Sequence, residues 1–133
     1  MRIINYTKDN YDQALGLSVH KDQEAFVPTV QESLAHAYIK PWDEAFDPYL
    51  LEEDGQLIGG FYISYTPNSL DNYWLGGFFI DKSYQGQGYG KKALSMIIDF
   101  IKVTYKPIEV LSLTVEAHNH RAMDLYQSFG FQT

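Results

Sequence analysis

The polar and apolar positions along the chain predict a sheet of short β-strands. The segment EVLSLTV at 109–115 alternates with the two-residue period of a strand. Two other runs are joined by Asp54-Gly55, a dipeptide that favours a hairpin turn. Phe78-Phe79-Ile80 is a continuous apolar run typical of a buried strand. The expected strands are residues 2–6, 46–53, 56–65, 73–80 and 109–115.

Other segments show helical spacing and helix-end signals. Thr29, with Glu32 three residues later, matches a capping box and predicts a helix from residue 30 to about residue 37. An earlier helix is expected after Asp9 or Asn10 as N-cap, running to about Val19. A short helix at 120–129 would end at Gly130.

A glycine-rich turn separates the strand at 73–80 from the longest expected helix. One apolar stripe indicates that helix and is formed by Ala93, Leu94, Ile97, Ile98 and Ile101. Strand, glycine turn and helix together point unpaired backbone N–H groups and the positive end of a helix at an anion. Lys91 and Lys92 stand in the first helical turn, where they either face a polyphosphate or lie solvated on the surface.

The glycine spacing limits the kind of phosphate ligand. Gly86, Gly88 and Gly90 are spaced G-x-G-x-G, whereas a dinucleotide fingerprint needs G-x-G-x-x-G and a Walker loop needs G-x-x-x-x-G-K-[ST]. Glu109 lies near the expected position of a ribose-binding acid, but it precedes its strand instead of ending it. We therefore reject a nicotinamide site.

Two motifs resemble those of the GCN5-related N-acetyltransferases (GNAT). Gln85-x-x-Gly88-x-Gly90 matches the [Q/R]-x-x-G-x-[G/A] pyrophosphate loop of that family. The block from Glu116 to Phe131 is similar to its E-x-N-x-x-A-x-x-L-Y-x-x-x-G-F signature. Short glycine patterns recur by chance, but two motifs in the family's order identify the chain as a member of this family.

The resemblance implies an α/β (α+β) fold in three αβα layers, whose central twisted mixed sheet splays apart at an acetyl-CoA site. It implies that the glycine turn holds the pyrophosphate, mainly through backbone N–H groups, and that residues 78–80 bind the pantetheine arm and the acetyl carbonyl. Core packing is the alternative role for 78–80, and helix capping is the alternative for Asn119. The residues assigned to the cofactor are Phe78, Phe79, Ile80, Gln85, Gly86, Gln87, Gly88, Tyr89, Gly90, Lys91, Asn119 and Tyr126.

Acetyl transfer to an amine requires that the acyl donor is held, that the carbonyl oxygen is stabilised as it gains charge, and that the amine is neutral. The resemblance implies that Tyr126 is the general acid that protonates the departing thiolate; the alternative is a tyrosine that only packs on its helix face. Polyamine-acting relatives often carry a carboxylate on the central strand, where this chain has Gly76 and Gly77. Glu116 is then a candidate base, and Asp22 and Glu24 are candidates for binding the amine or for deprotonating it through water.

The acceptor is indicated by a second resemblance. Gln23-x-x-Phe26-Val27 followed by Ser33-Leu34-Ala35 looks like the subset that acts on spermidine, spermine and other diamines. The expected reaction is direct transfer from acetyl-CoA to such a small amine, with both substrates bound together. Alternatives are a protein N-terminus, an amino acid or an antibiotic as acceptor, or a catalytically silent acyl-CoA-binding module.

Composition excludes several other classes of protein. A chain of 133 residues that is 45% hydrophobic predicts one domain, residues 1–133. The net charge of −7 argues against nucleic-acid binding, and the absence of cysteine excludes disulfides and a thiolate nucleophile. The four histidines are too scattered for a metal site. No signal peptide or long apolar run is present, so we expect a cytoplasmic protein without a membrane partner.

The family fold normally continues past Gly130-Phe131 with further strands, but this sequence stops at Thr133. The C-terminal strands are therefore expected to be truncated, which leaves a sheet edge unpaired. A longer natural chain or a second copy in a homodimer would cover that edge.

Overall fold

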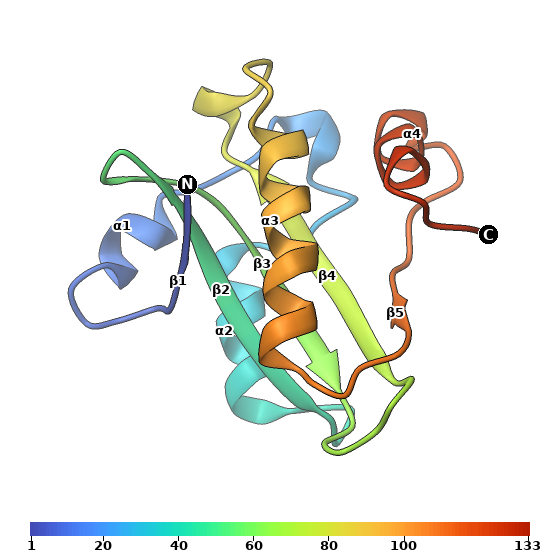
Figure 1. Ribbon diagram of the computed structural model, residues 1–133. Coiled ribbons are helices and arrows are strands. Elements are labelled where there is room, and N and C mark those ends of the chain that lie inside the picture. Colours follow the sequence, from blue (N-terminus) through green and yellow to red (C-terminus); the bar gives the residue numbers. More distant parts are fainter.

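A five-stranded mixed sheet forms the centre of the structure, a computed structural model that describes residues 1–133. The strands are β1 (Arg2–Ile4), β2 (Ala45–Glu53), β3 (Gln56–Tyr65), β4 (Tyr73–Ile80) and β5 (Leu111–Ser112). They lie in the order β1-β2-β3-β4-β5, antiparallel up to β4 and parallel between β4 and β5 (Figure 1). The predicted hairpin joins β2 to β3.

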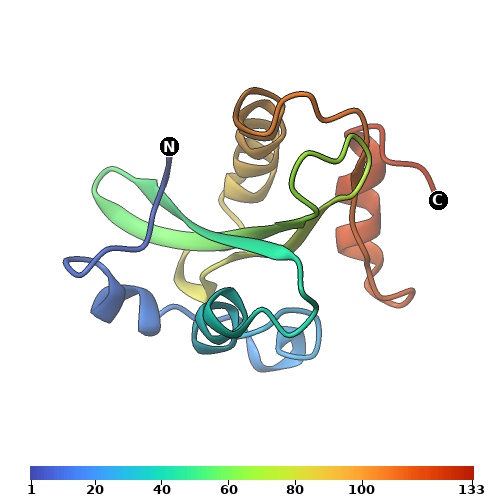
Figure 2. The ribbon, with the colours of Figure 1, turned by 90° about the horizontal axis from the view of Figure 1, so that it is seen from below.

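Helices cover both faces of the sheet. They are α1 (Tyr11–Leu15), α2 (Val30–Ile39), α3 (Tyr89–Thr104) and α4 (His120–Ser128), with short 3₁₀ turns η1 (Lys21–Gln23) and η2 (Lys82–Tyr84). The helices α1 and α2 lie on one face, α3 lies on the other, and α4 stands beside β5 (Figure 2). The predicted three-layer α/β architecture is therefore confirmed.

Apolar side chains fill the space between the layers. The α3 stripe predicted from the sequence packs on the sheet, with Ala93, Leu94 and Ile97 fully buried. A smaller cluster on the other face joins Ala14 of α1 and Val30 of α2 to the sheet. Because each fully buried Leu or Ile stabilises the fold by about 1.5–3 kcal/mol, these contacts fix both helix layers against the strands.

A β-bulge bends β4 near its end. Gly77 and Phe78 together oppose the single residue Phe61 of β3, and Gly77 has a left-handed φ of 60°. On its other side β4 pairs with β5 only through Tyr73–Leu111 and Trp74–Ser112. The main chain of β4 beyond Trp74 therefore has no strand partner on the β5 side, as the predicted splay requires.

Several element boundaries differ from the predictions. The first strand ends at Ile4, not at residue 6, because its pairing with β2 ends at Ile4–Leu50. The first helix ends at Leu15, not near Val19, because Gly16 is its C-cap and the following residues turn towards β4. The second helix continues to Ile39, beyond the expected residue 37. The expected strand at 109–115 is reduced to Leu111–Ser112, since β4 bends away and no strand lies on the other side of β5. None of the helices combines the length and the apolar composition that a membrane-spanning segment requires.

Candidate active site

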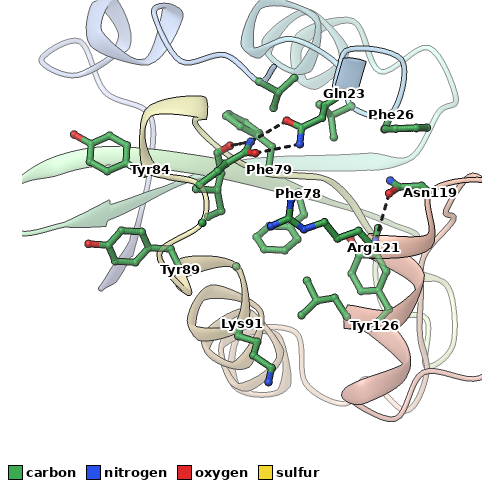
Figure 3. A pocket seen from close by; sticks show the side chains of 18 of the residues that line it. Gln23, Phe26, Phe78, Phe79, Tyr84, Tyr89, Lys91, Asn119, Arg121 and Tyr126 are labelled. Atoms are coloured by element: carbon green, nitrogen blue, oxygen red, sulfur yellow. Dashed lines mark hydrogen bonds between the residues drawn. The ribbon is translucent and has the colours of Figure 1, made fainter. Parts of the chain in front are cut away.

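A cavity of about 410 Å³ opens at the end of β4 (Figure 3). Its walls are the end of β4, the glycine loop (residues 85–91), segment 18–28 and α4. All residues assigned to the cofactor from the sequence line this cavity except Gln87. The structure thus brings together two motifs that lie far apart in the sequence.

The glycine loop presents free backbone donors. No N–H group from Gln85 to Lys91 donates a hydrogen bond within the protein. Gly86 and Gly88 adopt left-handed φ values of 77° and 82°, and Gly88 is the N-cap of α3. Successive N–H groups at the start of a 16-residue helix form a site for an anion, because the helix dipole adds positive potential there.

Side chains behind the loop hold this conformation. The buried Asp81 carboxylate accepts hydrogen bonds from the backbone N–H groups of Ser18 and Ser83, at 2.8 and 3.0 Å. The Gln85 amide donates to the carbonyl oxygen of Ile80 at 2.8 Å and to Gln23 at 2.9 Å. The Gln85 side chain therefore faces back towards β4 and segment 18–28, which leaves the backbone of the loop for a ligand.

The two lysines of the first helical turn have different roles. Lys91 lines the cavity, together with Arg121 of α4. Lys92 instead forms an ion pair with Glu53 at 3.0 Å, beside the β2–β3 hairpin. Of the two alternatives predicted for these lysines, the surface position fits Lys92, whose half-exposed side chain pairs with a carboxylate distant in the sequence. The charged residues that line the cavity are Lys91 and Arg121, and both are cationic.

Helix α4 places Tyr126 on the wall opposite the loop. Asn119 is the N-cap and accepts a hydrogen bond from the Ala122 N–H at 3.4 Å, while its side chain also lines the cavity. At the other end Gly130, with φ of 95°, follows the last helical turn, and Phe131 packs its ring on Tyr126 at a centroid distance of 5.8 Å. The two predicted ends of this helix thus fix the Tyr126 position.

The Tyr126 hydroxyl is available for chemistry. It makes no hydrogen bond to another protein group, although it lines the cavity. Burial raises the pKa of Tyr126 to about 12 from an ordinary value of 10.0. The phenol therefore remains protonated at neutral pH, where it can donate a proton but cannot accept one.

The predicted carboxylates lie outside the cavity. Glu116 precedes α4, and Asp22 and Glu24 flank Gln23; all three are exposed, and none lines the cavity. Gln87 is also exposed, at the tip of the loop. No group of three or more His, Asp or Glu side chains could hold a metal ion. The parts played by these carboxylates stay predictions.

The Tyr62 side chain explains why β4 has glycines at positions 76 and 77, where polyamine-acting relatives often carry a carboxylate. A Cβ atom at Gly76 or Gly77 would overlap the ring of Tyr62, which lies directly across from Gly76 on β3. That ring stacks on Phe46 with a centroid distance of 4.2 Å. The Tyr62 ring therefore occupies the space that a side chain at position 76 or 77 would need.

Several lining residues were not assigned to the site from the sequence. They are Val19, Gln23, Phe26, Val27, Tyr84, Arg121, Ala122 and Leu125. Ala122 and Leu125 occupy fixed positions of the second motif, and Gln23, Phe26 and Val27 belong to the run that resembles diamine acetyltransferases. The indication from the sequence was weaker for Arg121, which lies in the first turn of the helix capped by the motif residue Asn119.

These features fit the diphosphate and arm of coenzyme A. The free N–H groups and the two cations suit a polyphosphate, and no side chain fills the space beside the loop glycines. The unpaired edge of β4 and the apolar residues Phe78, Leu125 and Val27 suit a thin, partly polar chain. Fold and site together define a transferase that uses an acyl-CoA.

Comparison with known proteins assigns the family. A family model described as the acetyltransferase (GNAT) family matches residues 17–131, and the chain belongs to that family. A probable spermine N(1)-acetyltransferase from Bacillus subtilis subsp. natto and the spermine/spermidine N(1)-acetyltransferase from Bacillus subtilis strain 168 are each 34% identical over 131 residues, which cover 95% of this chain and 84% of theirs. The [ribosomal protein bS18]-alanine N-acetyltransferase of Escherichia coli K12 is 32% identical over 109 residues, 75% of this chain and 69% of its own.

A solved structure agrees at the level of the fold. A GNAT family acetyltransferase from Elizabethkingia anophelis, with acetyl-CoA bound, superposes with a TM-score of 0.66 at 19% identity, covering 98% of this chain and 75% of that one. The chain is therefore an N-acetyltransferase, and acetyl-CoA is its acetyl donor.

Proposed function

We propose that this enzyme acetylates a primary amine of a small polyamine or diamine, by direct transfer with both substrates bound together. The observation that carries the mechanism is the facing arrangement of free loop N–H groups and the Tyr126 hydroxyl across one cavity. The acceptor class rests on the identity of 34% to the two Bacillus enzymes over nearly the whole chain.

The glycine loop and the cations hold the donor in this proposal. The N–H groups of residues 85–91 bind the diphosphate, and Lys91 and Arg121 balance its charge. The main chain of β4 beyond Trp74 binds the pantetheine arm and the acetyl oxygen as a neighbouring strand would. Acetyl-CoA supplies the reactive thioester when it is bound.

Tyr126 acts as the general acid in this proposal. When the neutral amine attacks the carbonyl carbon, an N–C bond forms and the C–S bond breaks. The nitrogen releases its proton to water, and the sulfur leaves as a thiolate that needs a proton. The Tyr126 hydroxyl supplies that proton, because burial keeps it protonated far above neutral pH. Water returns a proton to the tyrosine afterwards. Because its pKa is raised to about 12, Tyr126 is a weaker acid than an alkyl thiol, so its contribution comes from its position beside the leaving sulfur and not from its acidity.

The amine must lose a proton before it attacks. An alkylamine with a pKa near 10.4 is neutral in roughly one of a few thousand molecules at pH 7, a penalty of about 4–5 kcal/mol. Since no carboxylate lines the cavity, we infer that water carries the proton out to exposed Glu116, or to Asp22 or Glu24 beside segment 18–28. The acidic protein, with a net charge of −7, also favours the approach of a polycation.

A second candidate acceptor is the N-terminus of a protein. It is supported by the identity of 32% to the bS18-alanine N-acetyltransferase, over 75% of this chain. A peptide acceptor would need an open groove beside Phe26 and Val27, whereas a polyamine needs only a channel for a single chain. The preference of the enzyme among amine acceptors in a thiol-release assay separates the two.

Two measurements test the proposal. Calorimetry with acetyl-CoA should give binding at micromolar concentration, and acetyl-pantetheine, which lacks the diphosphate, should bind far more weakly. A thiol-release assay should then give the highest kcat/KM with spermidine or spermine, compared with single amino acids and an alanine-initiated peptide. Binding of acetyl-CoA without turnover of any amine would indicate a silent binding module, and preference for the peptide would favour the second candidate.

A further inference from the structure

A pair of glutamines connects the two walls of the cavity. Gln23 at the end of η1 and Gln85 at the start of the glycine loop lie 62 residues apart in the sequence and exchange two side-chain hydrogen bonds, at 2.9 and 3.1 Å (Figure 3). Both residues line the cavity and are half-buried.

Further hydrogen bonds fix the orientation of both amides. The Gln85 amide nitrogen also donates to the Ile80 carbonyl oxygen at 2.8 Å, which uses both of its hydrogens. The Gln23 amide oxygen also accepts from the His20 backbone N–H at 3.2 Å, which holds η1 in shape. Neither amide can turn towards a ligand without giving up a partner, so the pair serves to join the two walls.

The joined segment forms the side of the cavity next to the acceptor in the proposed reaction. Segment 18–28 contains no regular element except η1, and it contributes Val19, Phe26 and Val27 to the cavity. Its main chain is tied to η2 only at its beginning, where Ser18 accepts a hydrogen bond from the Lys82 N–H at 2.8 Å. Beyond Ser18 the glutamine pair is its hydrogen-bonded link to the loop, and Phe26 meets His118 at a ring-centroid distance of 5.2 Å.

We propose that the Gln23–Gln85 pair couples the binding of the two substrates, so that Gln23 is a positioning residue for the amine. When coenzyme A binds, it holds the glycine loop in one conformation. The hydrogen bonds of the pair then restrict segment 18–28 as well, so that Phe26 and Val27 contact the amine in one arrangement. This inference rests on the proposed function, since it assumes that coenzyme A binds the loop and an amine binds beside the segment.

Linkage makes the proposal measurable. If coenzyme A strengthens the binding of the amine by a factor, the amine must strengthen the binding of coenzyme A by the same factor. Typical coupling factors run from about 5-fold to about 150-fold. We expect a factor of at least about 5 in the wild-type protein, measured with unacetylated CoA, which binds the loop but cannot react.

The experiment is calorimetric titration of spermidine with and without saturating CoA, for the wild type and three variants. Gln23→Leu removes the amide but keeps a side chain of similar bulk; we expect the coupling factor to fall to within about twofold of one. Binding of CoA alone should remain, because the loop N–H groups are unchanged. In steady-state assays the KM for spermidine should rise roughly tenfold while kcat at saturation changes little.

A charge pair provides the rescue. In Gln23→Glu combined with Gln85→Arg, opposite charges replace the amide pair, and the family motif admits Arg at position 85. This double variant should regain the coupling that Gln23→Leu loses. Gln13→Leu on α1, an exposed glutamine whose side chain makes no hydrogen bond, is the control for the loss of a glutamine and should behave as wild type.

The outcomes separate this inference from the proposed function. A wild-type coupling factor near one, or an unchanged factor in Gln23→Leu, overturns the inference while the acetyltransferase assignment stands. A coupling factor that the double variant does not restore overturns it as well, because a generally loosened protein would explain the loss. Failure of the wild type to bind acetyl-CoA contradicts the proposed function itself.

Discussion

At the residue scale, Gly90 offers a direct test of whether a ligand lies against the glycine loop. A Cβ atom added there would have no heavy atom within 4 Å, and Gly90, unlike Gly86 and Gly88, does not have a left-handed φ. A Cβ atom at this position therefore neither strains the backbone nor contacts another part of the protein. A loss of binding without a loss of stability would then indicate contact with the bound molecule itself.

We predict that Gly90→Leu weakens acetyl-CoA binding at least about tenfold without lowering the thermal midpoint, because Leu is a better helix former than Gly. Gly90→Ala is the matched control, since the family motif admits Ala there, and its affinity should stay within a few-fold of wild type. Calorimetry and a thermal melt measure both effects. Unchanged affinity in the Leu variant would place the diphosphate away from the loop.

Tyr126 carries the second prediction at this scale. Tyr126→Phe should lower kcat roughly 10²–10⁴-fold, the usual contribution of a general acid, while the KM for acetyl-CoA stays nearly constant. Stability should change little, because the hydroxyl makes no hydrogen bond within the protein. Tyr11→Phe on α1, at an exposed position, is the control. Equal kcat values for Tyr126→Phe and wild type would remove Tyr126 from the chemistry.

The pH profile adds a second readout for the same residue. Since no carboxylate lines the cavity, kcat/KM should rise about tenfold per pH unit below the pKa of the amine. The profile should not fall near pH 10, because burial raises the pKa of Tyr126 to about 12. A fall beginning near neutral pH would require a different proton donor, with a much lower pKa.

At the element scale, the end of β4 is shaped by its neighbour β3. Tyr62 lies across from Gly76, and its ring occupies the space that a Cβ atom at Gly76 would take. We predict that Gly76→Ala destabilises the protein by about 1–3 kcal/mol, the cost of overpacking, because Tyr62 must leave its stack with Phe46.

A double-mutant cycle tests the cause of that loss. Tyr62→Leu removes the ring atoms that meet position 76, so adding Gly76→Ala to it should cost less than about 0.5 kcal/mol. Urea denaturation of the four proteins gives the coupling energy. Additive effects would mean that Gly76 is required for a reason other than the Tyr62 ring, such as the bend of β4.

Elements governed by local chemistry were predictable from the sequence. The capping box of Thr29 and Glu32 forms as expected, and Asp54-Gly55 makes the hairpin turn. The apolar stripe of α3 faces the core as predicted. The glycine loop and Tyr126, which two family motifs had located in the sequence, lie in one cavity. In each case the deciding residues are neighbours in the sequence or belong to a recognisable motif.

Features that depend on distant partners were not predictable. Lys92 pairs with Glu53 across 39 positions, and Gln23 meets Gln85 across 62. The early end of α1 is linked to the bonds that Ser18 makes with the β4–η2 corner. The shortness of β5 follows from the bend in β4, which no periodicity of residues 109–115 reveals.

At the scale of the whole molecule, the buried Tyr105 and the half-buried Tyr49 and Tyr65 join the layers on the α3 side of the sheet. The Asp47 carboxylate of β2 accepts hydrogen bonds from Tyr65 of β3 at 2.9 Å and from Tyr105, which follows α3, at 2.8 Å. Tyr49 and Tyr105 share a hydrogen bond of 2.6 Å. Burial is the main cause that raises the pKa values of all three tyrosines, and hydrogen bonding to Asp47 raises those of Tyr65 and Tyr105 further.

These shifts predict loss of stability in alkali. A group whose pKa is raised in the folded state contributes stability that is complete below its unfolded pKa, near 10, and is lost as the pH rises through the folded value. Tyr6 and Tyr126 reach about 12, and the pKa values of Tyr49, Tyr65 and Tyr105 are raised as well. The tyrosines therefore leave stability constant around neutral pH and lower it progressively above pH 10.

Tyr105→Phe distinguishes the effect of the tyrosine cluster, formed by Asp47, Tyr49, Tyr65 and Tyr105, from that of the other tyrosines. At neutral pH the variant should lose about 1–3 kcal/mol, because Asp47 and Tyr49 each lose a buried partner. Above pH 10 its free energy of unfolding should fall less steeply than that of the wild type, since one raised pKa has been removed. Urea titrations across this pH range, with tyrosinate absorbance recorded in parallel, measure both effects. Tyr38→Phe, on a side chain that is 86% exposed, is the control and should follow the wild-type curve. If Tyr105→Phe lost stability with the same alkaline slope as wild type, the proton on Tyr105 would not be linked to folding, and the cluster would stabilise the layers by packing alone.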